Sequence, residues 1–249
     1  MIMSKEKQLF YTIENGVMTI TIDNIEMKNG LNYIGINQFA DAYDVLNSDD
    51  SIKVAVIKGS NGYFFGGGRV DPNCPGENEK YADAIQRYMK ACDDNKKPVI
   101  AAVNGTCYKA GLGTVAQADI AIAQKGVMFG LPEIRMGGIP MMIMVELMDY
   151  LPKKFAMEAY LSGWDFPAED AYRIGLVNKV VEESEFDATV QKYVDVFLNT
   201  NPELIRLTRK AYAMLSAIDE PVKRQEAGMK MLREEVLPAM TRIEQHYNP

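Results

Sequence analysis

The stretch PVIAAVNGTCYKAGLGTVAQADIAIAQKGVMFGLPEIRMGGIP, residues 98–140, decides how the rest of the chain is interpreted. It opens with a run of Val, Ile and Ala that is too short for a buried helix and predicts a buried strand. After an Asn-Gly pair, a segment rich in Gly and Ala predicts a helix that starts near Ala110. A second β-rich run over residues 119–123 follows, and the stretch then reaches Glu133. The stretch therefore predicts a strand, a helix and a second strand, with a carboxylate shortly behind them.

This order of elements has a chemical consequence. A strand that passes into a helix start leaves backbone N–H groups without acceptors at the positive end of the helix dipole. Such a place suits an anion, or an oxygen that becomes negative during a reaction. Because Glu133 follows a strand that lies beside the first one, we expect its side chain to face the same place. The stretch indicates an anion-stabilising backbone next to one acid/base side chain.

Composition bounds the class of protein. With 249 residues, the chain can bury a sizeable core as one domain, or as one domain with an appendage. Its apolar fraction of 47% and charged fraction of 24% are ordinary for a globular protein. The net charge is −7, and no run of Lys and Arg is long enough to follow a phosphate backbone. We therefore expect neither nucleic acid nor an anionic membrane as a partner.

The cysteines and the histidine narrow the chemistry further. Three cysteines without metal-site or CxxC spacing fit a reducing compartment better than a disulfide framework. No apolar signal segment stands at the N-terminus, and the most apolar tract, residues 139–148, contains Glu146 and is too short to span a bilayer. The single histidine, His246, argues against a histidine triad or a histidine-rich metal site. We expect a cytoplasmic protein without a membrane segment or a metal.

The remaining chain supports an α/β fold. Alternating apolar and polar residues on both sides of Asn15-Gly16 predict a β-hairpin. Strands interleaved with helices, followed by helices alone, predict an α/β core over residues 1–199 and a helical region over residues 200–249. We expect that region to pack on the core or on a neighbouring subunit. The consecutive glycines 66–68 would let a ligand approach the main chain closely.

Several separated motifs resemble the crotonase superfamily, also called the enoyl-CoA hydratase/isomerase family, in the order found there and along most of the chain. They are KNGLN (28–32), the glycines 66–68, KPVIAAVNG (97–105), FGLPEIRMGGIP (129–140) and LSGWDFPAEDAYRIGLVNKVV (161–181). The resemblance implies a spiral of ββα units with a helical C-terminal oligomerisation region. It also implies a homotrimer or a dimer of trimers, an acyl-CoA thioester as substrate, and no cofactor besides the coenzyme A that the substrate carries.

The resemblance also assigns site residues. Residues 64–70 look like the family's F-x-A-G-A-D-[IL], which places one backbone N–H donor for the thioester oxygen at Gly68. Residues 104–111 look like its N-G-x-x-x-G-G-G, which places the second donor at Ala110, and Glu133 matches a catalytic glutamate. Further positions that the resemblance assigns to substrate or CoA binding are Lys28, Gly66, Gly67, Gly111 and Met141.

The sequence departs from this pattern at an important position. Family members that hydrate enoyl-CoA carry a further glutamate, and its place is taken here by Gly113. Hydration needs one group for the water and another for the α-carbon, so a single Glu133 favours a double-bond shift, the reaction of an enoyl-CoA isomerase. The alternatives are an enoyl-CoA hydratase (a lyase) and, less favoured, a non-catalytic acyl-CoA-binding scaffold. Arg69, Lys109 and Met141 also replace the usual residues, and we expect the region near Pro140 to be narrower and more apolar than in a typical hydratase.

Two further features of the sequence are a loose dinucleotide-binding pattern and a cluster of methionines. Residues 111–116 fit the loose dinucleotide pattern G-x-G-x-x-[GA], but they do not directly follow a predicted strand, so we do not expect NAD. The methionines at 141, 142, 144 and 148 are predicted to pack in the core, with one of them able to touch the acyl chain.

Overall fold

The computed structural model defines the chain over residues 7–70 and 75–247. The chain divides into two compact units, residues 1–195 and 196–249, and each is described by itself. Residues 71–74, which include Cys74, lie outside the described residues.

The larger sheet of the first unit has six strands in the order β1-β2-β3-β5-β7-β10. All neighbours are parallel except β1 and β2, which form the predicted hairpin. Asn15 at φ 51° and Gly16 at φ 81° both adopt the left-handed conformation that a type I′ turn requires. The strands are β1 (Leu9–Glu14), β2 (Val17–Ile22), β3 (Val54–Gly59), β5 (Val99–Val103), β7 (Ile120–Gln124) and β10 (Lys179–Val181).

A second sheet of four short strands was not predicted. Its order is β4-β6-β8-β9, with β9 antiparallel to β8 and the other neighbours parallel. Each strand has three residues, too few to show an alternating pattern. The strands are β4 (Tyr63–Phe65), β6 (Thr106–Tyr108), β8 (Met128–Gly130) and β9 (Asp165–Pro167).

The two sheets are built from a repeated ββα unit. In β3-β4-α2, β5-β6-α3 and β7-β8-α4 the first strand joins the larger sheet and the second joins the smaller one. The Asn104 side chain links the first two of these ββα units. Its amide donates to Gly59 O (2.8 Å), and its oxygen accepts from Gly59 N (3.0 Å). The predicted α/β spiral of ββα units is confirmed. The helices are α2 (Glu77–Asp93), α3 (Ala110–Gln117) and α4 (Met141–Leu147).

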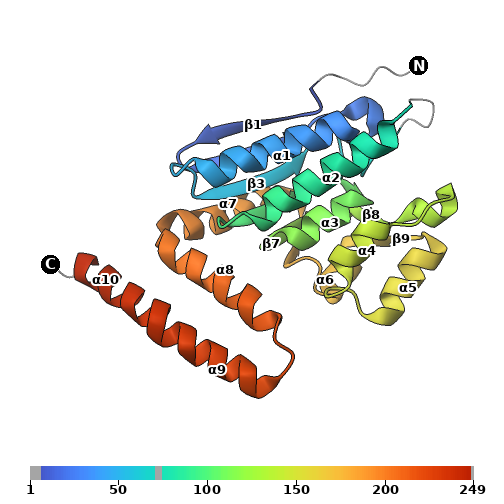
Figure 1. Cartoon of the computed structure of the whole chain (residues 1–249). Coiled ribbons are helices and arrows are strands. Elements are labelled where there is room, and N and C mark those ends of the chain that lie inside the picture. The colour runs from blue at the N-terminus through green and yellow to red at the C-terminus, as the bar shows by residue number, and fades with distance from the viewer. Residues whose placement is uncertain (1–6, 71–74, 248–249) are drawn as a thin grey trace. The chain divides into compact units, whose positions relative to one another are not determined.

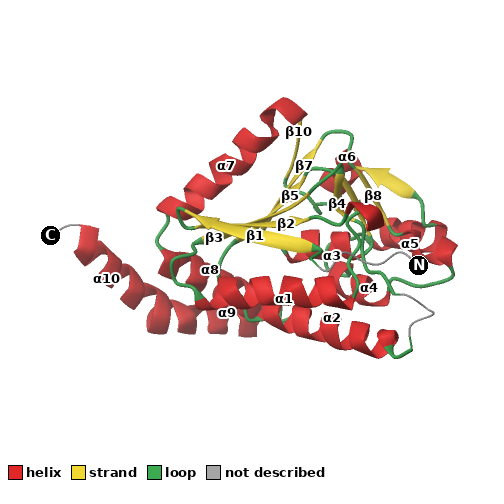
Figure 2. Ribbon diagram, turned by 90° about the horizontal axis from the view of Figure 1, so that it is seen from above, coloured by secondary structure: helices red, strands yellow, loops and turns green. Residues whose placement is uncertain are grey.

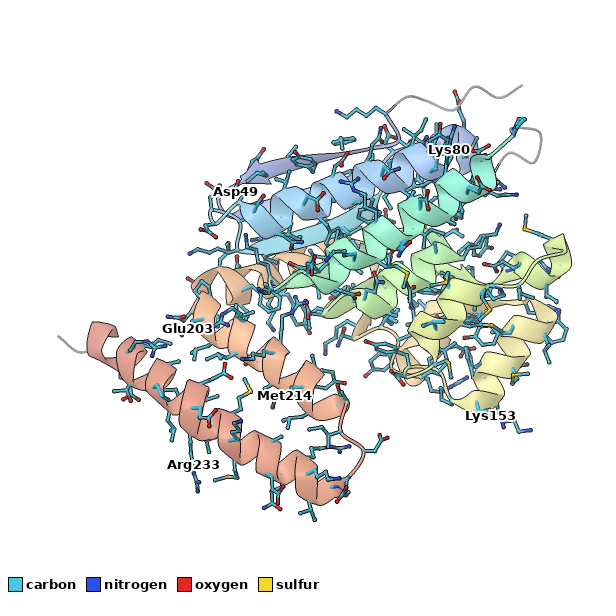
Figure 3. All side chains as sticks on the ribbon, in the orientation of Figure 1. Asp49, Lys80, Lys153, Glu203, Met214 and Arg233 are labelled. Atoms are coloured by element: carbon cyan, nitrogen blue, oxygen red, sulfur yellow. The ribbon has the colours of Figure 1, made fainter. Side chains whose placement is uncertain are left out.

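Helix α1 (Tyr33–Ser48) lies beside α2 along the larger sheet (Figures 1 and 2). It begins at Tyr33 because the Asn32 side chain accepts hydrogen bonds from the N–H groups of the first turn. At the first turn of α2, Lys80 lies 5.5 Å from the centre of the Tyr33 ring, at the end of the helix pair labelled in Figure 3. Phe39, Phe64 and Phe129 are almost fully buried in the core beneath these helices.

The other elements of the first unit are short connections and covering helices. Just before β10, Leu176 N and Val177 N donate to Ala171 O, and Asn178 N donates to Ala121 O. No helix in residues 7–70 and 75–247 is long and apolar enough to cross a membrane. The elements are η1 (Ile25–Met27), η2 (Pro132–Met136), α5 (Lys153–Ser162), α6 (Ala168–Arg173) and α7 (Glu183–Asn199), and the last contains the boundary between the units.

The second unit consists of helices, as predicted, and they are separated near residues 201–202 and 221. Asn201 accepts a hydrogen bond from Glu203 N (2.8 Å) and so caps the first of these helices. A small buried cluster centres on Leu207, Met231 and Ala239. That this region packs on the core or on another subunit stays a prediction. The helices are α8 (Pro202–Ser216), α9 (Pro221–Met231), one π-helical turn (Leu232–Val236) and α10 (Leu237–Tyr247).

Candidate active site

A cavity of about 300 Å³ lies within the first unit, between α1, α2, α3, η2 and the start of α4. Four of the residues singled out in the sequence line it, namely Gly68, Ala110, Glu133 and Met141. Most of the other walls are apolar, which is typical of a site for a small organic ligand. They include Ile36, Phe39, Phe65, Ile85, Ile139 and Ile143.

The glycine run after β4 is held by the segment that contains KNGLN. Gly66 N donates to Asn29 O (3.2 Å), and Leu31 N donates to Gly67 O (3.0 Å). Arg69 N then donates back to Leu31 O (2.9 Å), so that Leu31 and Gly68 form an isolated parallel bridge. None of these hydrogen bonds uses the N–H of Gly68, which has no acceptor within the described residues. The first predicted donor is therefore free to bind a ligand oxygen.

Asn29 fixes this segment, a role that the sequence motif alone did not reveal. Its side-chain amide donates to Ser60 O (2.9 Å) and to Tyr63 O (2.6 Å), and its oxygen accepts from Asn24 N (2.9 Å). The residue is completely buried and lies at φ 55°. Because its amide reaches β4 directly, Asn29 holds the turn against the strand that leads into the glycine run.

Three of the predicted binding positions, Gly66, Gly67 and Gly111, pack closely against other parts of the chain and do not line the cavity. A Cβ at Gly66 would lie 2.2 Å from Lys28 O, and a Cβ at Gly67, which has φ 84°, would lie 2.3 Å from Lys109 Cβ. A Cβ at Gly111 would likewise lie only 2.7 Å from Phe65 O. Glycine at these positions permits the close backbone packing that forms the site.

Lys28 lies outside the cavity as well. Its side chain is exposed, and its backbone has the left-handed conformation at φ 54°. Contact with a coenzyme A phosphate, which the resemblance assigns to Lys28, stays a prediction.

The second predicted donor stands at the start of α3. The helix begins at Ala110, as predicted, so the Ala110 N–H belongs to the first turn and has no acceptor inside the helix. Lys109 precedes it at φ 54° and ψ −121°, and Lys109 N donates to Gly130 O (3.0 Å) in β8. That bond anchors the chain just before the helix. The Ala110 N–H and the positive end of the helix dipole are thus both available at the cavity.

Glu133 reaches the same cavity from the first turn of η2. Burial raises the pKa of its carboxyl group, while its own backbone N–H and the Lys109 ammonium act in the opposite direction. Its Oε2 is buried and accepts no hydrogen bond from any described residue. A buried carboxylate oxygen without a partner is costly for folding, which favours a role toward a ligand.

Comparison with known proteins agrees with this geometry. Residues 12–240 match the enoyl-CoA hydratase/isomerase family. The chain belongs to this family.

The chain is also similar to individual members of this family and to solved structures. A mevalonyl-coenzyme A hydratase of Aspergillus fumigatus is 30% identical over 203 residues, covering 77% of this chain and 73% of that protein. A carnitinyl-CoA dehydratase of Salmonella typhi is 28% identical over 236 residues, covering 93% of this chain and 88% of its own. The structure of an enoyl-CoA hydratase from Mycobacterium smegmatis superposes with a TM-score of 0.82 at 24% identity, over 96% of both chains. This likeness shows the shared fold.

Tyr81 is a polar group in this enoyl-CoA hydratase/isomerase family site that sequence analysis missed. A Cβ at Gly68 would lie 1.4 Å from the Tyr81 hydroxyl, so this hydroxyl occupies the space beside the first donor. Burial, and then the charge of Glu133, raise the pKa of Tyr81 to about 12. The available signal was helical spacing, because Tyr81, Ile85 and Tyr88 lie on one face of α2 and line the cavity together.

Glu146 is the second group that sequence analysis missed. A Cβ at Gly113, the position of the missing family glutamate, would lie 1.7 Å from Glu146 Oε2. Glu146 comes from α4, and its Oε1 accepts a hydrogen bond from Gln117 Nε2 (2.9 Å). Burial, and then the charge of Asp93, raise the pKa of Glu146 to about 7. The only signal in the sequence was an acidic residue within the most apolar tract of the chain.

The predicted packing of the methionines in the core is wrong for three of the four. Met141, Met142 and Met148 are 55%, 38% and 75% exposed, and the first two line the cavity. Met144 is partly buried and packs against the core as predicted. Met141 and Met142 leave the core because α4 supplies a wall of the cavity, whereas Met148 lies just after α4 and does not line it.

The raised pKa of Glu146 predicts a change in stability with pH. The folded state binds this proton more tightly than the unfolded chain, so the wild-type protein loses stability as pH rises from about 4.5 to about 7. Glu146→Gln removes that loss. We expect the variant to unfold with a free energy at most about 3 kcal/mol higher than wild type at about pH 8, and with no such gain at about pH 4.

Urea denaturation at both pH values measures this difference. Glu158→Gln, a change of the same chemistry at an exposed position of α5, is the matched control and is expected to change neither value. A difference between Glu146→Gln and wild type that does not depend on pH would contradict the prediction.

Proposed function

We propose that the protein transfers protons on the acyl chain of an acyl-CoA thioester through an enolate intermediate. The main support for this proposal is the set of groups that line the cavity. The cavity is lined by Gly68 and Ala110, whose backbone N–H groups have no acceptor among the described residues. It is also lined by Glu133, whose Oε2 has no partner there. Membership of the enoyl-CoA hydratase/isomerase family supports the thioester as the substrate class.

The chemistry follows from these groups. The thioester carbonyl oxygen accepts hydrogen bonds from the N–H groups of Gly68 and Ala110. When a proton leaves the α-carbon, negative charge moves onto that oxygen, and each preorganised donor lowers the barrier by roughly 3 kcal/mol. Glu133 accepts the proton and can return it, and burial makes its carboxylate a stronger base than an exposed one.

Two reactions can proceed from such an enolate. With Glu133 as the sole base, removal of a proton from one carbon and its return to another shifts a double bond, and this isomerisation is the candidate that the sequence favours. Addition or removal of water is the second candidate, supported by relatives that are named a hydratase and a dehydratase. It requires a second group that handles the water.

Incubation with saturated and unsaturated acyl-CoA esters in D2O, followed by mass spectrometry, tests the proposal. We expect deuterium to enter the acyl chain of saturated thioesters. The products of the unsaturated thioesters distinguish a shifted double bond from added water. Thioester binding without any deuterium uptake or product would contradict the proposal and favour a non-catalytic scaffold.

We also propose that the protein acts as a homotrimer or a dimer of trimers, as the resemblance implies, and in the cytoplasm, as its cysteine usage and N-terminal sequence suggest. The metal-free chemistry described above uses side chains and backbone alone. Within residues 7–70 and 75–247, no group of three or more His, Cys, Asp and Glu side chains is placed to hold a metal ion.

A further inference from the structure

We infer that Glu146 is the second catalytic carboxyl group of this site, and that it acts on water from α4 in place of the family glutamate absent at Gly113. This inference rests on the enolate chemistry proposed above and decides between its two candidate reactions in favour of water addition.

The position of Glu146 is the first argument. Any side chain at Gly113 would start 1.7 Å from Glu146 Oε2, so this carboxylate fills the space where such a side chain would begin. Gly113 lies one helical turn after Ala110, whose N–H we assign to the thioester oxygen. Glu146 lines the same cavity as Ala110 and Glu133. A glycine at 113 is thus what allows the carboxylate to enter from the neighbouring helix.

The hydrogen bonding of Glu146 is the second argument. Oε1 accepts from Gln117 Nε2, which lies one further turn along α3 and sets the direction of the carboxylate. Oε2 has no hydrogen-bond partner among the described residues. One oxygen is therefore held in place, and the other remains available to a water molecule.

The charges around Glu146 make a purely structural role unfavourable. No cation of the described chain forms an ion pair with Glu146, and the nearby Asp93 carries the same charge. Removing a carboxylate from water without a cationic partner costs stability. Residues that reduce stability in this way are typical of functional sites.

The reaction balances with the groups at hand. The Glu146 carboxylate takes a proton from a water molecule as the water oxygen bonds to the β-carbon of an enoyl thioester. The electrons of the double bond move toward the thioester oxygen, which the N–H groups of Gly68 and Ala110 hold. Glu133, in its protonated form, then gives its proton to the α-carbon. One water is added, and the proton gained by Glu146 returns to Glu133 through solvent. Dehydration uses the same steps in reverse.

The test separates water chemistry from enolate chemistry in the same protein. Wild-type protein is first given 2-enoyl-CoA esters of different chain length, and hydration is followed by mass spectrometry. The ester that is hydrated fastest is then used for Glu146→Gln. We expect hydration to fall about 100-fold. Deuterium uptake into the matching saturated thioester, which needs only Glu133, should stay within about threefold of wild type. The exposed Glu158→Gln variant should keep both activities.

A relocation variant provides the second measurement. In the double variant Gly113→Glu/Glu146→Ala, the carboxylate returns to α3 and the side chain that would collide with it is gone. We expect hydration at least about tenfold faster than in Glu146→Ala alone, and equal rates in the two variants would contradict a water-handling carboxylate at this place.

Each contrary outcome has a distinct meaning. Hydration that survives in Glu146→Gln overturns this inference, and so does a wild-type protein that exchanges deuterium or shifts a double bond without adding water to any ester. In both cases the proposed enolate chemistry stands. Failure of the wild-type protein to exchange deuterium or convert any thioester overturns the proposed function itself.

Discussion

Glu133→Gln is expected to lower deuterium uptake and turnover by roughly 10³-fold. The amide has almost the same size as the carboxylate and keeps the shape of the cavity, but it cannot accept a proton from the α-carbon. Glu133 Oε2 has no partner among the described residues, so its replacement breaks no hydrogen bond at that atom. Deuterium uptake into a saturated acyl-CoA ester, read by mass spectrometry, measures the loss directly.

Binding provides the control for this variant. Because we assign the thioester oxygen to the N–H groups of Gly68 and Ala110, affinity for a saturated acyl-CoA ester should change by less than about threefold in calorimetry. Glu158→Gln on the exposed face of α5 serves again as the matched substitution. Full activity of Glu133→Gln would show that another group carries the proton.

Ala110→Pro is expected to reduce turnover by about 10²- to 10³-fold, the usual effect of deleting one oxyanion donor. Proline removes the backbone N–H of residue 110 and is tolerated at the first position of a helix, where that N–H has no partner inside the helix. The enolate oxygen would then keep only the donor at Gly68. Steady-state kinetics with the best thioester of the panel measures this effect.

Ala110→Gly is the matched control, because it removes the side chain and keeps the N–H. We expect its turnover to stay within about tenfold of wild type. Circular dichroism of both variants verifies that α3 still forms, since Lys109, at φ 54°, precedes the proline and must keep its conformation. A folded Ala110→Pro variant with wild-type turnover would contradict the assignment of this N–H to the oxyanion.

Much of the fold could be predicted from neighbouring residues. The hairpin at Asn15-Gly16 and the start of α3 at Ala110 both follow from local backbone preferences. An Asn-Gly pair in the left-handed conformation closes a tight hairpin, and the Ala-containing segment after Lys109 favours a helix. Such preferences act between residues close together in the chain, so they can be recognised without tertiary information.

The smaller sheet could not be predicted in this way. Strands of three residues, such as Tyr63–Phe65 and Thr106–Tyr108, are too short to show a period. β4, β6 and β8 exist because each follows a longer strand of the larger sheet and finds parallel neighbours in a second sheet, which supply hydrogen bonds. Pairing between segments far apart in the sequence, not local preference, defines these strands.

The sequence by itself determined the α/β fold, the family, and the three residues assigned to the oxyanion and its base, Gly68, Ala110 and Glu133. Only the tertiary structure decided that a second carboxylate stands at the site. Gln117 and Glu146 are 29 residues apart, and they meet because α4 packs against α3. In the sequence, Gly113 shows only that the family glutamate is missing at that position. Sequence patterns for turns, caps and helices depend on residues close together in the chain, so they do not reveal Glu146. What fills the space beside that glycine depends on packing between helices, which no local pattern specifies.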